Sequence, residues 1–306
     1  MAEPVEFVEV SPRDGLQNEA TLIATEDKLA LIDRAAAAGL RRIETTSFVN
    51  PQRVPQMADA DAVAAGCAAR PGPAYSVLAL NLRGLDRALA AGAQEINYVF
   101  VASETFSIRN NGAPTFETLK AWPAAHARAR EAGVKLAAVV SAAFGCPFEG
   151  EVPVARVMQV AEAVFAHAPD EIALADTIGV ATPADVKSRF TALAAAAPQG
   201  VRLRAHFHDT RRTGVANALT AFEYGVPIID ASLGGVGGCP FAPGAAGNVA
   251  TEDVVYAFER SGVRTGIDLD AAIDAARWIL DKLGRNGGGV ARAGGFPKGQ
   301  AAAHAA

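Results

Sequence analysis

The sequence predicts a (β/α)8 barrel, an α/β fold of the TIM-barrel type, and three observations lead to that prediction. Eight short apolar segments alternate with amphipathic ones at a period of about thirty to forty residues. Several amphipathic segments end at a glycine shortly before the next apolar one, as at Gly39 and Gly133, and glycine closes helices in this way. A doubly wound open sheet would carry a glycine-rich phosphate-binding loop after its first strand, and residues 11–14 (Ser-Pro-Arg-Asp) do not form one.

The elements follow in order along the chain. Alternating polarity predicts a first strand over residues 6–10, and a helix over 27–39 places Leu29, Ile32 and Ala36 on one face. Further strands are expected over residues 42–46, 75–80, 95–101, 134–141, 171–175, 201–207 and 228–233. Further helices are expected over residues 54–67, 83–91, 115–132, 154–166, 183–196, 213–224, 251–261 and 269–283. We therefore expect residues 1–285 to form a single barrel with extra C-terminal helices, and the Gly- and Ala-rich residues 286–306 to form a flexible tail.

Composition narrows the class of protein. Half of the 306 residues are apolar, 20% are charged, and the formal net charge is −5. A basic run with interleaved aromatic residues is absent, which argues against nucleic-acid binding, and so is an apolar run long enough to span a bilayer. The three cysteines are odd in number and far apart, which favours a reducing compartment. With no signal or transit sequence at the N-terminus, we expect a cytoplasmic protein.

A His-x-His segment is the first candidate for chemistry. His206 and His208 are two of five histidines in the chain, and they fall at the end of the seventh predicted strand. Because side chains alternate along a strand, the two imidazoles point the same way and form half of a metal site. The alternative is a pair of ordinary histidines near a strand end.

Other polar side chains fall at the ends of the predicted strands, where a barrel gathers its catalytic groups. Arg13 and Asp14 follow the first strand, Glu44 ends the second, Asp176 ends the sixth, and Cys239 and Asn248 follow the eighth. Each also has an ordinary interpretation: a surface ion pair, a carboxylate paired with Arg41 or Arg42, an inert thiol, or a helix cap. Gathered on one rim, they favour an active site.

The ligand types at this rim suit a hard divalent cation. Two imidazoles, a carboxylate and an amide oxygen form a mixed set that favours Mg²⁺ or Mn²⁺, with Co²⁺ or Zn²⁺ as alternatives. Such an ion lowers the pKa of a substrate hydroxyl and acts as a Lewis acid. Arg13 is placed to hold a developing oxyanion, and Cys239, on a glycine-rich loop, is placed to enter when that loop closes.

Several long motifs identify a family. They are residues 8–19 (VEVSPRDGLQNE), 44–51 (ETTSFVNP), 145–150 (GCPFEG), 175–180 (ADTIGV), 205–210 (AHFHDT) and 237–248 (GGCPFAPGAAGN). Together they resemble the motifs of 3-hydroxy-3-methylglutaryl-CoA lyases, metal-dependent TIM barrels, over about residues 5–267.

The resemblance implies roles for individual residues. Asp14, His206, His208 and Asn248 match metal ligands, and Arg13, Cys239, His206, Asp176 and Glu44 match catalytic residues. Arg13, Gln17 and Ser47 are expected to contact the acyl-CoA thioester. The implied reaction is a retro-Claisen cleavage to acetyl-CoA and acetoacetate, a step of leucine degradation and ketone-body metabolism. We expect a homo-oligomer, a dimer or higher, that binds neither nucleic acid nor membrane.

Two departures from the family pattern leave the acyl group open. Arg211 and Arg212 stand where a Tyr-Gly pair is common, and we expect them either to grip a carboxylate or CoA phosphate or to be solvated. Val139 and Ala142 stand where Tyr and Cys are expected, so a related substrate such as citramalyl-CoA is an alternative.

Three other functions compete with the lyase. A condensing synthase of the isopropylmalate or homocitrate type would carry a longer C-terminal extension. A metal-dependent hydrolase would place its His-x-His on the first strand. A non-catalytic barrel would have no use for such a charge cluster, which is costly to bury.

Overall fold

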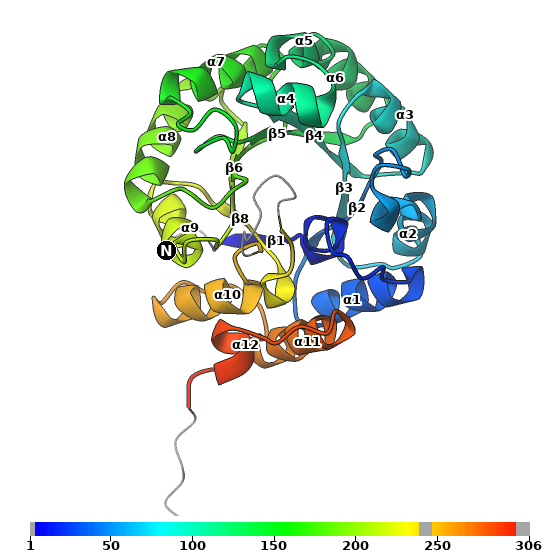
Figure 1. The fold of residues 1–306 in the computed structure, drawn as a ribbon, viewed down its shortest axis with the longest axis vertical. Helices are drawn as coiled ribbons and strands as arrows, with labels where there is room; N and C mark the ends of the chain where they lie inside the picture. The colour runs from blue at the N-terminus through cyan, green and yellow to red at the C-terminus, as the bar shows by residue number, and fades with distance from the viewer. Residues whose placement is uncertain (1–3, 239–246, 298–306) are drawn as a thin grey trace, which may run out of the picture.

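Eight parallel strands close into a barrel in the computed structural model, which describes residues 4–238 and 247–297 (Figure 1). The strands are β1 (Glu6–Glu9), β2 (Arg42–Ser47), β3 (Ala74–Ala79), β4 (Glu95–Val101), β5 (Lys135–Ser141), β6 (Glu171–Asp176), β7 (Arg202–Phe207) and β8 (Ile228–Ala231). Each strand pairs with the next along the chain, and β8 returns to pair with β1, with Glu6 opposite Ile228. The predicted (β/α)8 barrel is confirmed.

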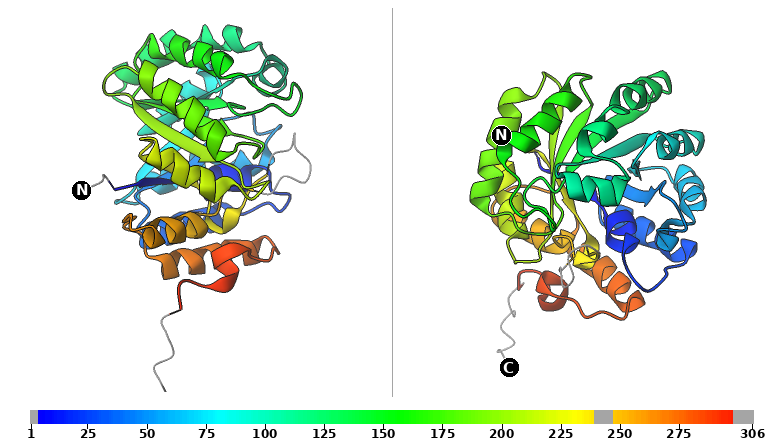
Figure 2. Two further views of the ribbon diagram at one scale, coloured as in Figure 1. Left: turned by 90° about the vertical axis from the view of Figure 1, so that its left-hand side faces the viewer. Right: turned by 45° about the horizontal axis from the view of Figure 1, so that its top comes forward.

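Helices form a ring outside the strands (Figures 1 and 2). They are α1 (Thr25–Ala37), α2 (Ala60–Ala68), α3 (Leu82–Ala90), α4 (Glu104–Asn111), α5 (Thr115–Leu119), α6 (Trp122–Glu131), α7 (Val154–Phe165), α8 (Pro183–Ala196), α9 (Gly214–Glu223), α10 (Thr251–Arg260), α11 (Leu269–Lys282) and α12 (Gly289–Ala293). Three shorter turns of helix are η1 (Ser11–Gly15), η2 (Pro55–Met57) and η3 (Leu233–Gly235). None of the helices in the described part of the chain is both long and apolar enough to cross a membrane.

The helices differ from the sequence-based expectation in four places. The helix expected over residues 54–67 is divided into the short turn η2 and the helix α2, which begins at Ala60. The helix expected over residues 115–132 is divided into α5 and α6, and Pro123 lies in the first turn of α6, where its missing N–H is tolerated. Helix α4 was not expected, because its eight residues show little amphipathic pattern. Helix α12 lies within the segment expected to be a flexible tail; the Asp253 carboxylate accepts a hydrogen bond from the Val290 N–H, at 2.6 Å.

Aromatic packing joins the barrel to its helices. Trp122 of α6 is fully buried against Tyr98 and Phe100 of β4, with ring centroids 5.9 and 5.6 Å away. Its indole N–H donates to the Val164 carbonyl of α7 at 3.0 Å, so the one polar atom of the ring is satisfied. Burial of this size stabilises the outer layer by about 2–3 kcal/mol for each large side chain.

Charged side chains, by contrast, occupy the interior near the start of the strands. The Arg42 guanidinium donates from Nε to Glu95 at 2.7 Å and from Nη1 to Glu171 at 2.7 Å. Arg42 therefore does not neutralise Glu44, which is one pairing that the sequence left open. Apolar branched residues usually fill barrel interiors, so this network is a distinguishing feature of the chain.

A buried carboxyl supports the turn after β8. The Glu252 side chain of α10 is almost fully buried and accepts a hydrogen bond from the Gly234 N–H of η3 at 3.0 Å. Burial, helped by the nearby Asp253 and Glu9 carboxyls, raises the pKa of Glu252 from 4.5 to about 8. The folded protein therefore keeps a proton that the unfolded chain releases, and this group makes stability fall as pH rises from about 4.5 to about 8.

We predict that Glu252→Gln increases stability above pH 8 by roughly 1–3 kcal/mol, because the amide keeps the acceptor without a buried charge. The variant and the wild type should converge below about pH 4, where the carboxyl is largely protonated in both states. Urea unfolding at about pH 4 and about pH 8.5 measures the difference. Equal stabilities at pH 8.5 would contradict the assignment.

Candidate active site

The turn after β1 presents Arg13 and Asp14 to the barrel mouth. Residues Ser11–Gly15 form a single π-helical turn in which the Gly15 N–H donates to the Val10 carbonyl at 3.1 Å. Single π-turns of this kind recur at functional sites because they re-aim side chains. A Cβ on Gly15 would lie 2.7 Å from Val236, so only glycine lets the turn approach the segment after β8 this closely.

Asn248 reaches the same place from the other side. The segment around it pairs with the end of β7, where His208 lies opposite Asn248, and the Val249 N–H donates to the Phe207 carbonyl at 3.0 Å. Val249 also accepts a hydrogen bond from the Ser232 N–H at 3.1 Å. The segment therefore bridges the tops of β7 and β8 and fixes the Asn248 amide beside the two histidines.

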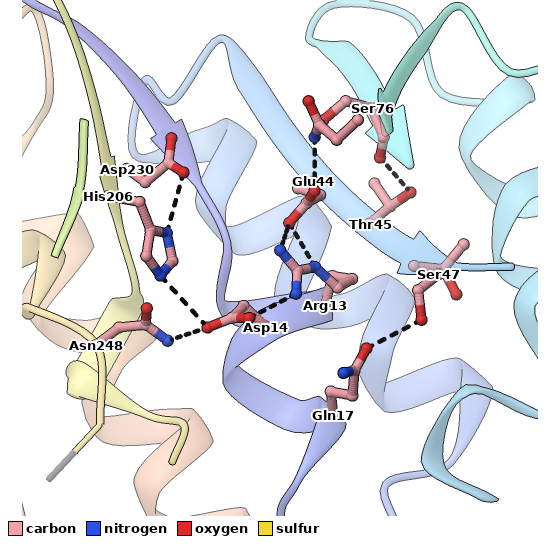
Figure 3. A network of polar contacts seen from close by, with 12 residues as sticks. Arg13, Asp14, Gln17, Glu44, Thr45, Ser47, Ser76, His206, Asp230 and Asn248 are labelled. Carbon is pink, nitrogen blue, oxygen red and sulfur yellow. Dashed lines mark hydrogen bonds and ion pairs between the residues drawn. The ribbon is translucent and has the colours of Figure 1, made fainter. Parts of the chain in front are cut away.

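Asp14, His206 and His208 form a cluster suited to a metal ion. Asp14 Oδ2 lies 3.8 Å from His206 Nε2 and 3.6 Å from His208 Nε2. One ligand atom from each of the three residues lies within 4.8 Å of the others, and the Asn248 amide nitrogen lies 2.9 Å from the same Asp14 oxygen (Figure 3). Burial alone would raise the pKa of Asp14, but Arg13 and the two histidines hold it well below its usual range.

One buried polar atom at this cluster fits a cation. Asn248 Oδ1 has no hydrogen-bond partner among the described residues. An unsatisfied amide oxygen beside a carboxylate and two imidazoles is a donor that a hard divalent ion satisfies. The residue types and their burial therefore fit the metal that the sequence predicts.

Asp230 is a site residue that the sequence analysis missed. It ends the run Ile228-Ile229-Asp230 of β8, and its Oδ2 lies 3.0 Å from His206 Nδ1. A carboxylate on Nδ1 favours the tautomer whose Nε2 lone pair faces Asp14. Burial opposes ionisation of Asp230, but Arg204 and His206 lower its pKa. The sequence offered one sign of this role: Asp230 is the only acidic residue in an otherwise apolar strand.

Arg13 lies between two carboxylates. Its Nε donates to Glu44 at 2.5 Å, and its Nη1 lies 2.5 Å from Asp14 Oδ1 (Figure 3). Burial disfavours the charged guanidinium, yet the charges of Glu44 and Asp14 raise the pKa of Arg13 above its ordinary value. Glu44 thus holds a permanent cation beside the metal cluster.

A cavity of about 890 Å³ opens over this cluster. Its lining includes six of the residues predicted from the sequence: Arg13, Asp14, Gln17, Glu44, His206 and His208. Val139 also lines it, whereas the Ser47 hydroxyl donates to Gln17 Oε1 at 3.0 Å and so acts on the cavity through that side chain. A cavity of this size accommodates a small molecule with several polar groups.

Three further predicted residues, Asp176, Arg211 and Arg212, do not line the cavity. Both oxygens of the buried Asp176 accept backbone N–H groups of the loop after β6, from Val180 and Ala181. Arg211 donates to the Ile178 and Gly179 carbonyls, and the exposed Arg212 pairs with Asp209 at 3.3 Å; neither lines the cavity. Cys239 lies outside the described residues.

Comparisons with known proteins agree with this picture. The model of the HMGL-like family matches residues 4–279. Hydroxymethylglutaryl-CoA lyase of Bacillus subtilis is 43% identical over 281 residues, which cover 92% of this chain and 94% of that protein. The mitochondrial hydroxymethylglutaryl-CoA lyase of Gallus gallus is also 43% identical, with the same coverage. A solved HMG-CoA lyase of Acinetobacter baumannii, in complex with coenzyme A and 3-methylmalate, superposes with a TM-score of 0.91 at 37% identity and covers 97% of each chain.

The close approach at Gly237 provides a test of the site geometry. Its φ is +124°, and an added Cβ would lie 2.6 Å from Asn248 Nδ2, whereas a Cβ on Gly238 would meet no atom of the described residues within 4 Å. We predict that Gly237→Ala destabilises the protein by about 1–3 kcal/mol and that Gly238→Ala changes stability by no more than about 0.5 kcal/mol. Thermal unfolding of the two variants measures this, and equal effects would refute the inferred contact.

Proposed function

The chain belongs to the HMGL-like family, and from that premise we propose that it cleaves 3-hydroxy-3-methylglutaryl-CoA to acetyl-CoA and acetoacetate. It is a carbon–carbon lyase. The observation that carries the proposal is the single cavity that joins the Asp14–His206–His208 cluster to the Arg13 guanidinium. A cation site and a fixed positive charge side by side suit a reaction in which an alkoxide precedes an enolate.

A divalent metal, Mg²⁺ or Mn²⁺, is part of the proposal. Asp14, His206, His208 and Asn248 would hold it. Bound there, it would supply Lewis-acid polarisation of the substrate's hydroxyl and neighbouring oxygen. The Asp230 carboxylate on His206 Nδ1 would keep that ring oriented toward the ion, since it leaves Nε2 free of a proton.

Arg13 would stabilise the charge that forms on the thioester. In a retro-Claisen cleavage the tertiary hydroxyl loses its proton, the electrons of the breaking C–C bond pass into the thioester enolate, and the enolate carbon is then protonated. The Arg13 guanidinium, held by Glu44, needs no reorganisation to face the enolate oxygen. We assign the proton transfers to Cys239 and His206 on the family resemblance, and Asp176 to shaping the loop after β6.

Three arginines that line the cavity would bind the CoA phosphates. Arg53, Arg83 and Arg87 line the cavity where the segments after β2 and β3 meet it. Arg87 is paired with Asp61 at 2.9 Å, whereas Arg83 makes no hydrogen bond or ion pair with the other described residues. An exposed, unpaired guanidinium at a cavity edge is suited to a phosphate. These positions replace Arg211 and Arg212 as our proposed CoA contacts.

Some properties remain proposals from the sequence. They are the cytoplasmic location, the oligomeric state, the place in leucine degradation and ketone-body metabolism, and the choice between Mg²⁺ and Mn²⁺. Val139 in the cavity lining favours one second candidate, since a small side chain leaves room for a differently branched acyl group such as that of citramalyl-CoA.

A thioester panel tests the function. We expect purified protein, stripped of metal and resupplied with Mg²⁺ or Mn²⁺, to release acetyl-CoA and acetoacetate from 3-hydroxy-3-methylglutaryl-CoA, and to be inactive without metal. Citramalyl-CoA in the same panel distinguishes the second candidate. Turnover of neither thioester with any divalent metal would refute the lyase proposal.

We predict that Arg53→Ala with Arg83→Ala raises KM for the acyl-CoA by about tenfold or more with kcat little changed, because binding remote from the reacting atoms is lost. Arg212→Ala is the matched control: it removes an exposed arginine that does not line the cavity. Steady-state kinetics of the variants measures both effects. A raised KM in Arg211→Ala or Arg212→Ala alone would instead restore the sequence-based prediction.

A further inference from the structure

We propose that Asn97 and Arg204, both buried inside the barrel, are a positioning pair that links the Arg13–Glu44 ion pair to the Asp230–His206 pair. The inference rests on the proposed function for the roles of Arg13 and His206. Neither Asn97 nor Arg204 is at the rim from which the sequence analysis drew its candidates. Figure 3 shows the two pairs that they join, Glu44 with Arg13 and Asp230 with His206.

Asn97 makes the connection to Glu44. It lies on β4, is 1% exposed, and donates from Nδ2 to Glu44 Oε1 at 2.5 Å. Its other amide atom, Oδ1, accepts from Arg204 Nη2 at 2.9 Å. Because a guanidinium only donates hydrogen bonds, Arg204 requires the Asn97 oxygen to face it. The amide nitrogen is then fixed toward Glu44, which in turn holds Arg13.

Arg204 makes the connection to Asp230. It lies on β7, is 2% exposed, and forms ion pairs from Nε to Asp230 Oδ1 at 3.5 Å and from Nη1 to Glu171 at 3.1 Å. The Nε and Nη1 atoms have no aligned hydrogen-bond partner among the described residues, so Arg204 acts on Asp230 through its charge. Asp230 keeps its other oxygen on His206 Nδ1, at 3.0 Å.

The contacts therefore form a closed ring across the barrel. Starting at Arg13, it passes through Glu44, Asn97, Arg204, Asp230, His206 and Asp14 and returns to Arg13. The ring ties β2, β4, β7 and β8 to the turn after β1. Residues that hold metal ligands in place without touching the metal commonly matter for binding: removing one typically weakens metal affinity by about 10–100-fold.

The ring has two arms, the contact of Asn97 with Glu44 and the contact of Arg204 with Asp230. Breaking each arm should have a different effect on kcat and on Mn²⁺ affinity. Asn97→Leu breaks the arm to Glu44 and should lower kcat by about tenfold or more, while Mn²⁺ affinity stays within about threefold of wild type. Arg204→Met breaks both arms and should weaken Mn²⁺ binding by about 10–100-fold as well as lowering kcat. Arg204→Lys keeps the positive charge but not the guanidinium group that contacts Asn97 and Asp230 at the same time. This variant should therefore retain much of the Mn²⁺ affinity but still have a lower kcat.

Titration calorimetry of Mn²⁺ into the metal-free full-length protein, with kcat and KM, tests this. The control is Arg189→Met, which removes a buried arginine that donates to the Ala143 and Val152 carbonyls and touches neither arm. The control should keep wild-type Mn²⁺ affinity and kcat even where it lowers the melting temperature. A folded Arg204→Met variant that binds Mn²⁺ and turns over like the wild type would overturn the proposal.

Two further outcomes are decisive. If Arg204→Met does not fold, an Asn97→Leu variant with unchanged kcat, or an Arg204→Lys variant identical to wild type in every readout, overturns the proposal. If the wild type cleaves no thioester, the proposed function fails, yet the Mn²⁺ affinities of Arg204→Met and Arg189→Met still decide the arm to Asp230. The two failures are therefore distinguishable.

Discussion

The site depends on one carboxylate, Asp14, that lies between a guanidinium, two imidazoles and an amide N–H group. Asp14 lies beside the Arg13 guanidinium and within 3.8 Å of two imidazole nitrogens, in a mouth that leaves it mostly buried. A buried carboxylate is tolerated only when such partners are present, so the turn after β1, the end of β7 and the Asn248 segment must be placed together. The remainder of the mouth is arranged to keep that placement.

The barrel supplies this placement through its topology. Parallel strands deliver their C-terminal ends to one rim, which is why residues as distant as 14, 44, 206 and 248 meet. The interior below the rim is polar, and its arginines are paired with acids from several strands, Arg42 with Glu95 and Glu171, and Arg204 with Asp230. Each such pair restricts how neighbouring strands can shift, because separating it would leave a buried charge alone.

The sequence predicted the fold and the centre of the site for a physical reason. Strand and helix periods are local, and a barrel converts strand ends into neighbours, so Asp14 and the two histidines could be expected together. Contacts through the interior are not local: nothing near Asn97 or Arg204 in the chain indicates that they meet. Side-chain direction is equally hidden, and Arg211 turned out to bind the carbonyls of the loop after β6 instead of the cavity. Cys239 stays a prediction, since it lies outside the described residues.

The most direct test of the central claim is a crystal structure of the protein with Mn²⁺, located by its anomalous scattering. The account predicts one strong peak within about 2.3 Å of an Asp14 oxygen and of Nε2 of both His206 and His208, with the Asn248 oxygen turned toward it. A peak elsewhere, or an Mn²⁺-saturated crystal with no peak among these four side chains, would contradict it.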